Sequence, residues 1–361
     1  MRPIFYVFIA FFLHACAQKP VSFEKASFKD IGGVEIFSEN NFADRFGKNC
    51  HLLAKRHKNQ YETLFGTAEK WQNICSKAVK SSDFADFIES HFQVYEVLSQ
   101  KESLFTGYYA PYMAGSITKT AVYNVPLHQK PTDIFKLYLK DLGVKGFDKP
   151  FVVRVDSQSK TVQPYFERKN ISQSDAKPLL WLKSEIDAFF LQIQGSGFVK
   201  LENGDVFHAS YAGSNGHAYR AIGRDLIQRG YLKKEEVSME SIRRVLKNNP
   251  QVMSDILNLN PRYIFFRKGD GQVRGSLNVP LKQEKSLAVD PEYIPLGLPV
   301  FVKTQRSFDQ KAINTWMFAE DTGAAIQGGL RGDIYFGQGE IAGQYAGSQN
   351  ATGKMYVIVS K

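Results

Sequence analysis

The spacing of apolar residues divides the chain into alternating helical and β-rich segments. Between residues 42 and 100, apolar residues recur every three or four positions and glycines are few, which predicts helices. After Phe105 the pattern changes to short runs of β-branched and aromatic residues bounded by Gly, Pro, Asn or Ser. These runs predict strands at 106–111, 121–126, 151–155 and 189–194.

Helical spacing returns between residues 217 and 260. Gly230 is placed to end one predicted helix, Ser238 to cap the next, and Pro250 to break it. Strands are predicted again at 263–266, 299–302 and 355–359. Short strands, dense turns and the lack of an internal repeat favour a mainly β protein with helical decorations, and a barrel over a doubly wound parallel sheet.

The first nineteen residues have the pattern of an export signal. Arg2 is followed by an apolar run from Ile4 to Leu13, which is too short to span a bilayer but suits a secretory signal. The sequence Leu13-His14-Ala15-Cys16 resembles the lipobox of bacterial lipoproteins. We therefore expect residues 1–15 to be removed and Cys16 to carry acyl chains that hold the protein to a membrane. A buried N-terminal strand or helix is the alternative.

Two further cysteines, Cys50 and Cys75, lie on the apolar faces of predicted helices. In an exported protein an even pair favours a disulfide. Two buried free thiols are the alternative, because cysteine often packs as a small apolar residue.

Composition and charge narrow the function classes. The 361 residues are 43% hydrophobic, which excludes a disordered or polytopic membrane protein. The net charge of +10 suits nucleic acid, an anionic membrane or an acidic polymer such as a bacterial cell wall. The basic residues are scattered and no nucleic-acid module is present, so we expect no nucleic-acid partner. No second His or Cys lies at metal-ligand spacing from His217, so we expect neither a metal nor another cofactor.

Three aspartates in the C-terminal β region suggest carboxylate chemistry: Asp290, Asp321 and Asp333. Asp333 lies between a glycine and apolar residues, where burial would raise its pKa and suit it to donate a proton. The alternative for Asp290 and Asp321 is a turn role in which the carboxylate accepts backbone N–H groups. The Asp321-Thr322-Gly323 sequence also occurs in aspartic proteases, but that mechanism needs two such loops and the chain has one.

Two glycine-rich segments, 194–197 and 211–220, carry hydrogen-bonding side chains, and the second also contains Tyr211 and Tyr219. Neither segment matches a phosphate-binding loop or a dinucleotide fingerprint. Their composition fits a sugar-binding groove. Tight β-turns with buried hydroxyls are the alternative.

Taken together, these segments resemble the membrane-bound lytic murein transglycosylase A family. The similarity runs in the same order along the chain, over 105–111, 194–197, 211–222, 260–281 and 286–335. The resemblance implies that residues 16–112 and 270–361 form a helical N-terminal part together with a double-psi β-barrel catalytic domain. It also implies an inserted β-rich domain at 113–269, with a glycan groove between the two.

The resemblance further implies a lytic transglycosylase that cleaves the β-1,4 bond between N-acetylmuramic acid and N-acetylglucosamine in peptidoglycan and forms 1,6-anhydromuramic acid. Asp333 would be the catalytic acid and base, supported by Asp321 and Asp290. We expect the following residues to contact the glycan: Thr106, Tyr108, Gln194, Ser196, Asn215, Tyr219 and Tyr335.

The resemblance and the lipobox together imply a lipid-anchored protein of the bacterial periplasm, attached to the outer membrane. Its partners would be peptidoglycan glycan strands and cell-wall synthesis or division proteins. Two alternatives remain open. One is a glycan hydrolase built on the same barrel, and the other is a lipoprotein that binds peptidoglycan without cutting it.

Overall fold

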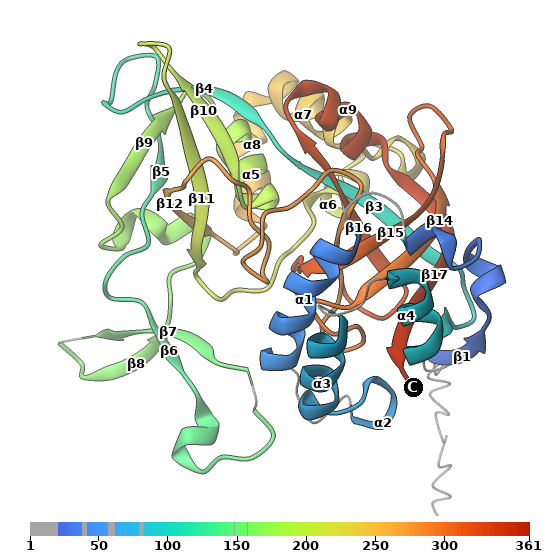
Figure 1. Cartoon of the computed structure of the whole chain (residues 1–361). Helices are drawn as coiled ribbons and strands as arrows, with labels where there is room; N and C mark the ends of the chain where they lie inside the picture. Colours follow the sequence, from blue (N-terminus) through green and yellow to red (C-terminus); the bar gives the residue numbers. More distant parts are fainter. Residues whose placement is uncertain (1–20, 38–41, 57–61, 79–82, 148, 157) are drawn as a thin grey trace, which may run out of the picture.

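A six-stranded barrel forms one half of the molecule (Figure 1). The computed structural model describes residues 21–37, 42–56, 62–78, 83–147, 149–156 and 158–361. The barrel closes because β17 pairs with both β14 and β3. The strands are β3 (Ser103–Ala110), β13 (Ser286–Ala288), β14 (Pro299–Gln305), β15 (Ala312–Asp321), β16 (Arg331–Gln338) and β17 (Asn350–Ser360). Two more strands, β1 (Ser22–Ala26) and β2 (Phe92–Leu98), extend this sheet beyond β17.

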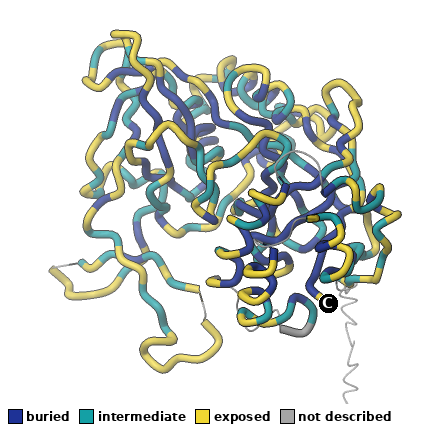
Figure 2. Tube along the Cα trace, in the orientation of Figure 1, coloured by how far each residue is buried: buried dark blue, intermediate teal, exposed yellow. Residues whose placement is uncertain are grey.

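The chain between β3 and β13 builds the second β-rich part of the molecule. A six-stranded sheet has the order β12-β11-β10-β4-β9-β5. Its strands are β4 (Tyr112–Ser116), β5 (Val125–His128), β9 (Pro178–Leu182), β10 (Gly197–Leu201), β11 (Val206–Ser214) and β12 (Ile264–Lys268). A three-stranded arm, β6 (Phe135–Leu137), β7 (Phe151–Asp156) and β8 (Thr161–Pro164), projects from this part and is largely exposed (Figure 2).

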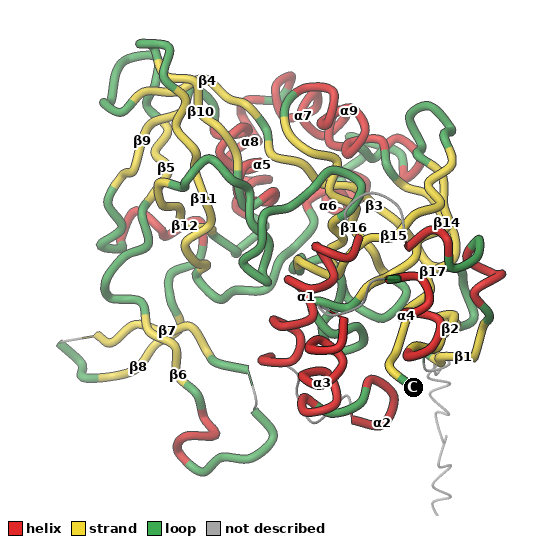
Figure 3. Tube along the Cα trace, in the orientation of Figure 1, coloured by secondary structure: helices red, strands yellow, loops and turns green. Residues whose placement is uncertain are grey.

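Helices cover both parts (Figure 3). The barrel shares one apolar core with residues of α1, α3 and α4. Four helices of the inserted segment form a separate core, to which α5 contributes Phe189 and Phe190. The helices are α1 (Phe42–Arg56), α2 (Glu62–Phe65), α3 (Ala68–Ala78), α4 (Phe84–His91), α5 (Glu185–Gln194), α6 (Ile222–Gln228), α7 (Met239–Asn248), α8 (Pro250–Asn258) and α9 (Glu340–Ser348).

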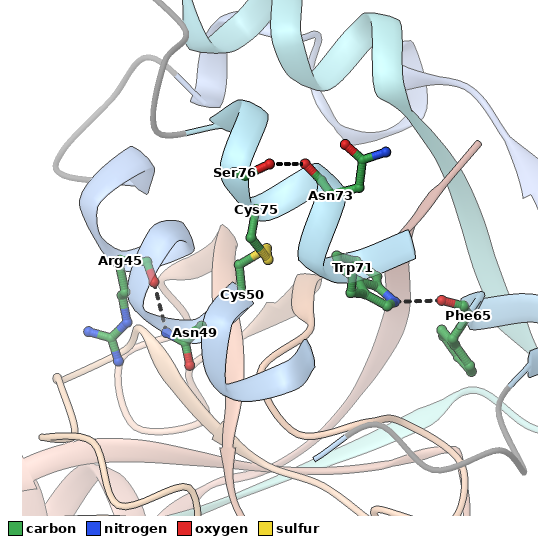
Figure 4. Close-up of a disulfide and its surroundings, with 8 residues drawn as sticks. All are labelled: Arg45, Asn49, Cys50, Phe65, Trp71, Asn73, Cys75 and Ser76. Atoms are coloured by element: carbon green, nitrogen blue, oxygen red, sulfur yellow. Dashed lines mark hydrogen bonds between the residues drawn. A yellow bond between two sulfur atoms is a disulfide. The ribbon is translucent and has the colours of Figure 1, made fainter. Parts of the chain in front are cut away.

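A disulfide joins α1 to α3 (Figure 4). It links Cys50 to Cys75, the pair that the sequence places on two apolar helix faces, and both residues are buried. The bridge ties α1 to α3, and both helices pack on the barrel through the shared core. The other cysteine, Cys16, and the predicted signal at 1–15 lie outside the described residues.

The predicted mainly β fold class with a barrel and helical decorations is confirmed. Three helices lie between residues 217 and 260, and the Ser238 side chain accepts a hydrogen bond from the Ser241 N–H at the start of α7. Gly230 follows α6 with a φ of 76°, a left-handed conformation that glycine adopts without steric cost.

Three predicted elements are wrong. Residues 92–98 form a strand and not the end of a helical segment, because pairing with β1 and β17 places Phe92 and Val94 on one face and Val97 on the other, and all three are buried in the same core. Residues 189–194 are helical and belong to α5. This helix packs against two cores at once, so residues 188–191 are apolar without a break and resemble a buried strand. Residues 121–122 are a bend, residues 123–124 are irregular, and the strand begins at Val125.

Candidate active site

A groove lies between the barrel and the second β part, with a cavity volume of about 1100 Å³. Its lining comes from β3, β15 and β16 on the barrel side, and from α5, β11 and β12 on the other. Both Asp321 and Asp333 line it.

The register of the barrel explains why these two aspartates meet. The short strand β13 lies between β15 and β16, and Ala288 of β13 is paired with Asp321 on one side and Asp333 on the other. Side chains of directly paired residues point to the same face of a sheet. Both carboxylates therefore point to the same face, separated by one strand that carries only the methyl group of Ala288.

Asp333 is half-buried and held by the strand beside it. The Thr106 hydroxyl on β3 donates to Asp333 Oδ1 at 2.7 Å, and Arg331 Nη2 lies 3.3 Å from the Thr106 hydroxyl oxygen. Burial raises the pKa of Asp333 to about 6, and the charge of Asp321 adds to the rise, while Thr106 and Arg331 oppose it. A carboxyl with this pKa can be protonated near neutral pH, as a general acid requires.

Asp321 is held more firmly than Asp333. Its Oδ1 accepts hydrogen bonds from the backbone N–H and hydroxyl of Ser276, at 2.8 and 3.0 Å, and from the Thr322 N–H at 2.8 Å. The approach of the Ser276 loop depends on Gly275, where a Cβ atom would lie 2.4 Å from the Glu320 carbonyl oxygen. Burial raises the pKa of Asp321, and these donors oppose the rise.

Two tyrosines complete the barrel side of the groove. The rings of Tyr108 and Tyr335 pack with centroids 5.2 Å apart. The buried Tyr108 hydroxyl lies close to Asp321, and its interaction with that carboxylate opposes the rise in the pKa of Asp321. Burial and the nearby charges of Asp321 and Asp333 raise the pKa of Tyr108 well above its usual value, so this hydroxyl stays neutral. As a neutral phenol it can donate a hydrogen bond, and it lies beside both carboxylates.

The remaining predicted glycan contacts divide into two groups. Gln194, Ser196 and Tyr219 line the groove. Thr106 does not line the groove. Its hydroxyl instead donates to Asp333 and helps to hold that carboxyl in place.

Asn215 serves the fold. Its Nδ2 donates to the carbonyls of Phe166 and Pro261, both at 2.8 Å, and its Oδ1 accepts from the Tyr263 N–H at 2.8 Å. It is 1% exposed and borders a smaller neighbouring cavity.

Asp290 holds a loop and does not line the groove. Its Oδ1 accepts from the Glu292 N–H at 3.0 Å, which is the turn contact considered from the sequence. Its Oδ2 accepts from the Gly328 N–H at 2.7 Å. Asp290 thereby holds the segment 323–328, part of which does line the groove.

A buried hydrogen-bond network behind Asp321 was not predicted from the sequence. Glu320, which is 1% exposed, accepts hydrogen bonds from Arg45 and from Asn49 of α1, the latter at 2.8 Å, and from Ser286 at 2.7 Å. Burial raises the pKa of Glu320, and the charge of Arg45 opposes the rise. This network joins α1 to the residue that precedes Asp321. Its partners are up to 275 positions apart, so local sequence patterns could not identify it.

Over the described ranges, no group of three or more His, Cys, Asp or Glu residues is arranged to hold a metal ion. The barrel side of the groove presents two unequal carboxylates and a neutral phenol.

Two family models match the chain. The MltA specific insert domain matches residues 104–267, and the 3D domain matches residues 285–359.

Similar proteins cover nearly the whole chain. "Membrane-bound lytic murein transglycosylase A" of Escherichia coli K12 is 28% identical over 363 residues, spanning 96% of this chain and 92% of that protein. A crystal structure of a membrane-bound lytic murein transglycosylase from Agrobacterium tumefaciens has a TM-score of 0.79 at 26% identity, covering 94% of this chain and 98% of the other. A structure of MltA from Neisseria gonorrhoeae has a TM-score of 0.74 at 29% identity, covering 94% and 93%.

Proposed function

Because the chain belongs to the membrane-bound lytic murein transglycosylase A family, we propose that it is a lytic transglycosylase acting on the glycan strands of peptidoglycan, with Asp333 as the single catalytic acid and base. The bond cleaved would be the β-1,4 linkage between N-acetylmuramic acid and N-acetylglucosamine. The product would be a 1,6-anhydromuramic acid end.

The observation that carries the assignment of Asp333 is its environment. It lines the groove, its pKa of about 6 lies well above the usual value for aspartate, and the Thr106 hydroxyl fixes the position of one carboxyl oxygen. Asp321 is less suited to the same role, because three donors already satisfy its Oδ1.

In the first step, protonated Asp333 donates its proton to the glycosidic oxygen as the bond from C1 of the muramic acid to that oxygen breaks. Positive charge then develops at C1 and on the ring oxygen. The ionised carboxylates of Asp333 and Asp321 lie on the groove surface, where they can stabilise that charge.

In the second step, the 6-hydroxyl oxygen of the same sugar attacks C1, and its proton passes to the Asp333 carboxylate. The ring closes, Asp333 regains its proton, and no water is consumed. Because the nucleophile belongs to the substrate, the reaction needs no protein nucleophile and no carboxylate to activate water.

We further propose the finer assignments of location and architecture. The protein is periplasmic and membrane-associated, and Cys16 would carry the lipid that anchors it to the outer membrane. None of the described helices is long and apolar enough to cross a bilayer. A division of the chain near residues 112 and 270 is supported by β3 ending at Ala110 in the barrel and β12 ending at Lys268 in the second sheet. Cell-wall synthesis or division proteins would be its protein partners.

The test is digestion of purified peptidoglycan by the protein from residue 17 onward, with mass analysis of the products. We expect muropeptides lighter by one water than reducing ones, and their loss in Asp333→Asn. Asp205→Asn, which makes the same chemical change in an exposed turn outside the groove, is the matched control and should match the unsubstituted protein. Reducing ends would indicate a hydrolase, and binding without products would indicate a peptidoglycan-binding protein.

A further inference from the structure

Five basic side chains line the groove: Lys149, Arg168, Arg262, Arg267 and Arg274. Lys149 and Arg274 have acidic partners, Glu292 and Asp270. The other three form no ion pair with any described residue. Arg267 is exposed and donates to the Tyr211 carbonyl, whereas Arg168 and Arg262 are half-buried.

Arg168 is fixed in place with part of its guanidinium unused. Its Nε donates to the Asn260 carbonyl at 3.0 Å, and its Nη2 donates to the Arg262 carbonyl at 2.6 Å. The guanidinium carbon lies 4.7 Å from the ring centroid of Phe189 and 5.3 Å from that of Tyr263. An arginine has five N–H donors, so these two bonds leave the other three without a partner among the described residues.

Arg262 lies beside it and is held by a single side-chain bond. Its Nη1 donates to the His217 carbonyl at 3.1 Å, and its backbone N–H donates to Asn260 Oδ1 at 3.2 Å. The Arg168 N–H donates to the carbonyl of Pro261 at 3.0 Å, which ties the two arginines into one unit. Four of the five guanidinium donors of Arg262 thus remain unused by described residues.

Burial of these cations is not offset by a nearby acid. Loss of solvation lowers the pKa of Arg168 to about 10 and also lowers that of Arg262, and no carboxylate contributes to either value. A partly desolvated cation without a counter-ion is costly, and an arriving anion would remove that cost. The guanidinium is also the group best matched to a planar carboxylate, through paired N–H donors.

From this geometry we propose that Arg168 and Arg262 form a carboxylate-binding subsite that recognises an anionic substituent of the glycan strand, rather than the sugar rings themselves. The proposal rests on the proposed function for the identity of the polymer. Peptidoglycan offers two sources of this group: the lactyl carboxylate of muramic acid in peptide-free strands, and the carboxylates of the stem peptide. Either source would explain why a sugar-binding groove keeps unpaired guanidinium groups.

Binding without turnover provides the test. In the full chain carrying Asp333→Asn, affinities are measured by calorimetry for three ligands: a neutral hexamer of N-acetylglucosamine, peptide-free glycan strands, and peptide-bearing glycan strands. Each is compared with and without Arg262→Gln. Arg229→Gln removes the same charge at an exposed position outside the groove and is the matched control. Arg168→Lys is a second variant that keeps the charge but loses the paired donors, and circular dichroism establishes that each variant is folded.

We expect Arg262→Gln to weaken binding of a carboxylate-bearing strand by about tenfold or more and to leave binding of the neutral hexamer within about twofold, because hydrogen bonds between charged groups are the stronger kind. A loss confined to peptide-free strands assigns the lactyl group, and a loss confined to peptide-bearing strands assigns the stem peptide. An equal loss for the neutral hexamer, or no loss for either charged strand, would overturn the proposal. Because none of these measurements needs turnover, the absence of anhydro products in the unsubstituted protein would count against the proposed reaction alone.

Discussion

The hydroxyl of Thr106 sets the pH range in which Asp333 can act as an acid. It donates to Asp333 Oδ1 at 2.7 Å and favours the ionised carboxylate. Thr106→Val removes this donor and keeps the shape of the side chain. Without the donor the ionised form loses support, so the pKa of Asp333 rises.

The size of the rise follows from the strength of the bond. A hydrogen bond to a charged group contributes about 1.5–3 kcal/mol, and about 1.4 kcal/mol corresponds to one pKa unit. The pKa of Asp333 should therefore move from about 6 to roughly 7–8. At pH 7 the protonated fraction would rise from about one tenth to between about one half and nine tenths.

The assay is kcat/KM for release of anhydro products between pH 4.5 and 9. This ratio reports ionisations of the free enzyme, and activity that depends on protonated Asp333 is lost as pH rises through its pKa. The alkaline limb of the profile should move to higher pH by roughly one to two units in Thr106→Val. Thr304→Val makes the same change on β14, where the hydroxyl donates to the Thr352 carbonyl, and should leave the limb in place. A folded Thr106→Val variant whose limb is unmoved, or moves to lower pH, would refute the reasoning.

Three further predictions concern stability. The native pKa of Asp333, about 6, lies above the unfolded value of 3.8, so ionisation of this carboxyl lowers the free energy of unfolding as pH rises from about 4 to 6. Asp333→Asn should remove this loss and raise the free energy of unfolding by about 3 kcal/mol at pH 7. Urea unfolding of both proteins at pH 4 and pH 7 measures the difference. Glu320→Gln should destabilise by about 3 kcal/mol or more, because it leaves buried Arg45 without its partner; a midpoint equal to that of the unsubstituted protein would contradict this. Replacing Cys50 and Cys75 by alanine should cost about 3 kcal/mol for a loop of 25 residues, and thermal unfolding of the native protein with and without reductant should show a matching difference.

Structural features that depend on residues close together in the sequence could be predicted from it. The caps at Ser238 and Gly230 and the terminal strand around 355–359 depend on neighbouring residues, and each is present. Helix α5 was not predictable from periodicity, because a helix buried on nearly all sides loses its polar face. The packing of α5 against two cores depends on residues far away in the sequence, so the pattern of neighbouring residues does not reveal it.

The same distinction applies to the site. Asp321, Asp333, Gln194 and Tyr219 were predicted to act together, and all four line one groove. Asn215 was grouped with them because it lies in a polar, tyrosine-rich segment, yet its amide is used entirely by backbone groups. Composition indicates which segments meet at the groove. It does not indicate which way each side chain points.

The order of strands in the barrel sets the order in which a new chain can fold. The second sheet uses only strands from β4 to β12, so it can form while the remainder of the chain is still emerging. By contrast, β3 must wait for β16 and β17, whose residues follow it by more than 200 positions. Loss of the final eleven-residue strand would leave the edges of β2, β3 and β14 unpaired at once. Unpaired strand edges promote association between chains, so a chain that lacks β17 should aggregate. Pairing of β17 with β2, β3 and β14 is therefore the folding step that protects the new chain from aggregation.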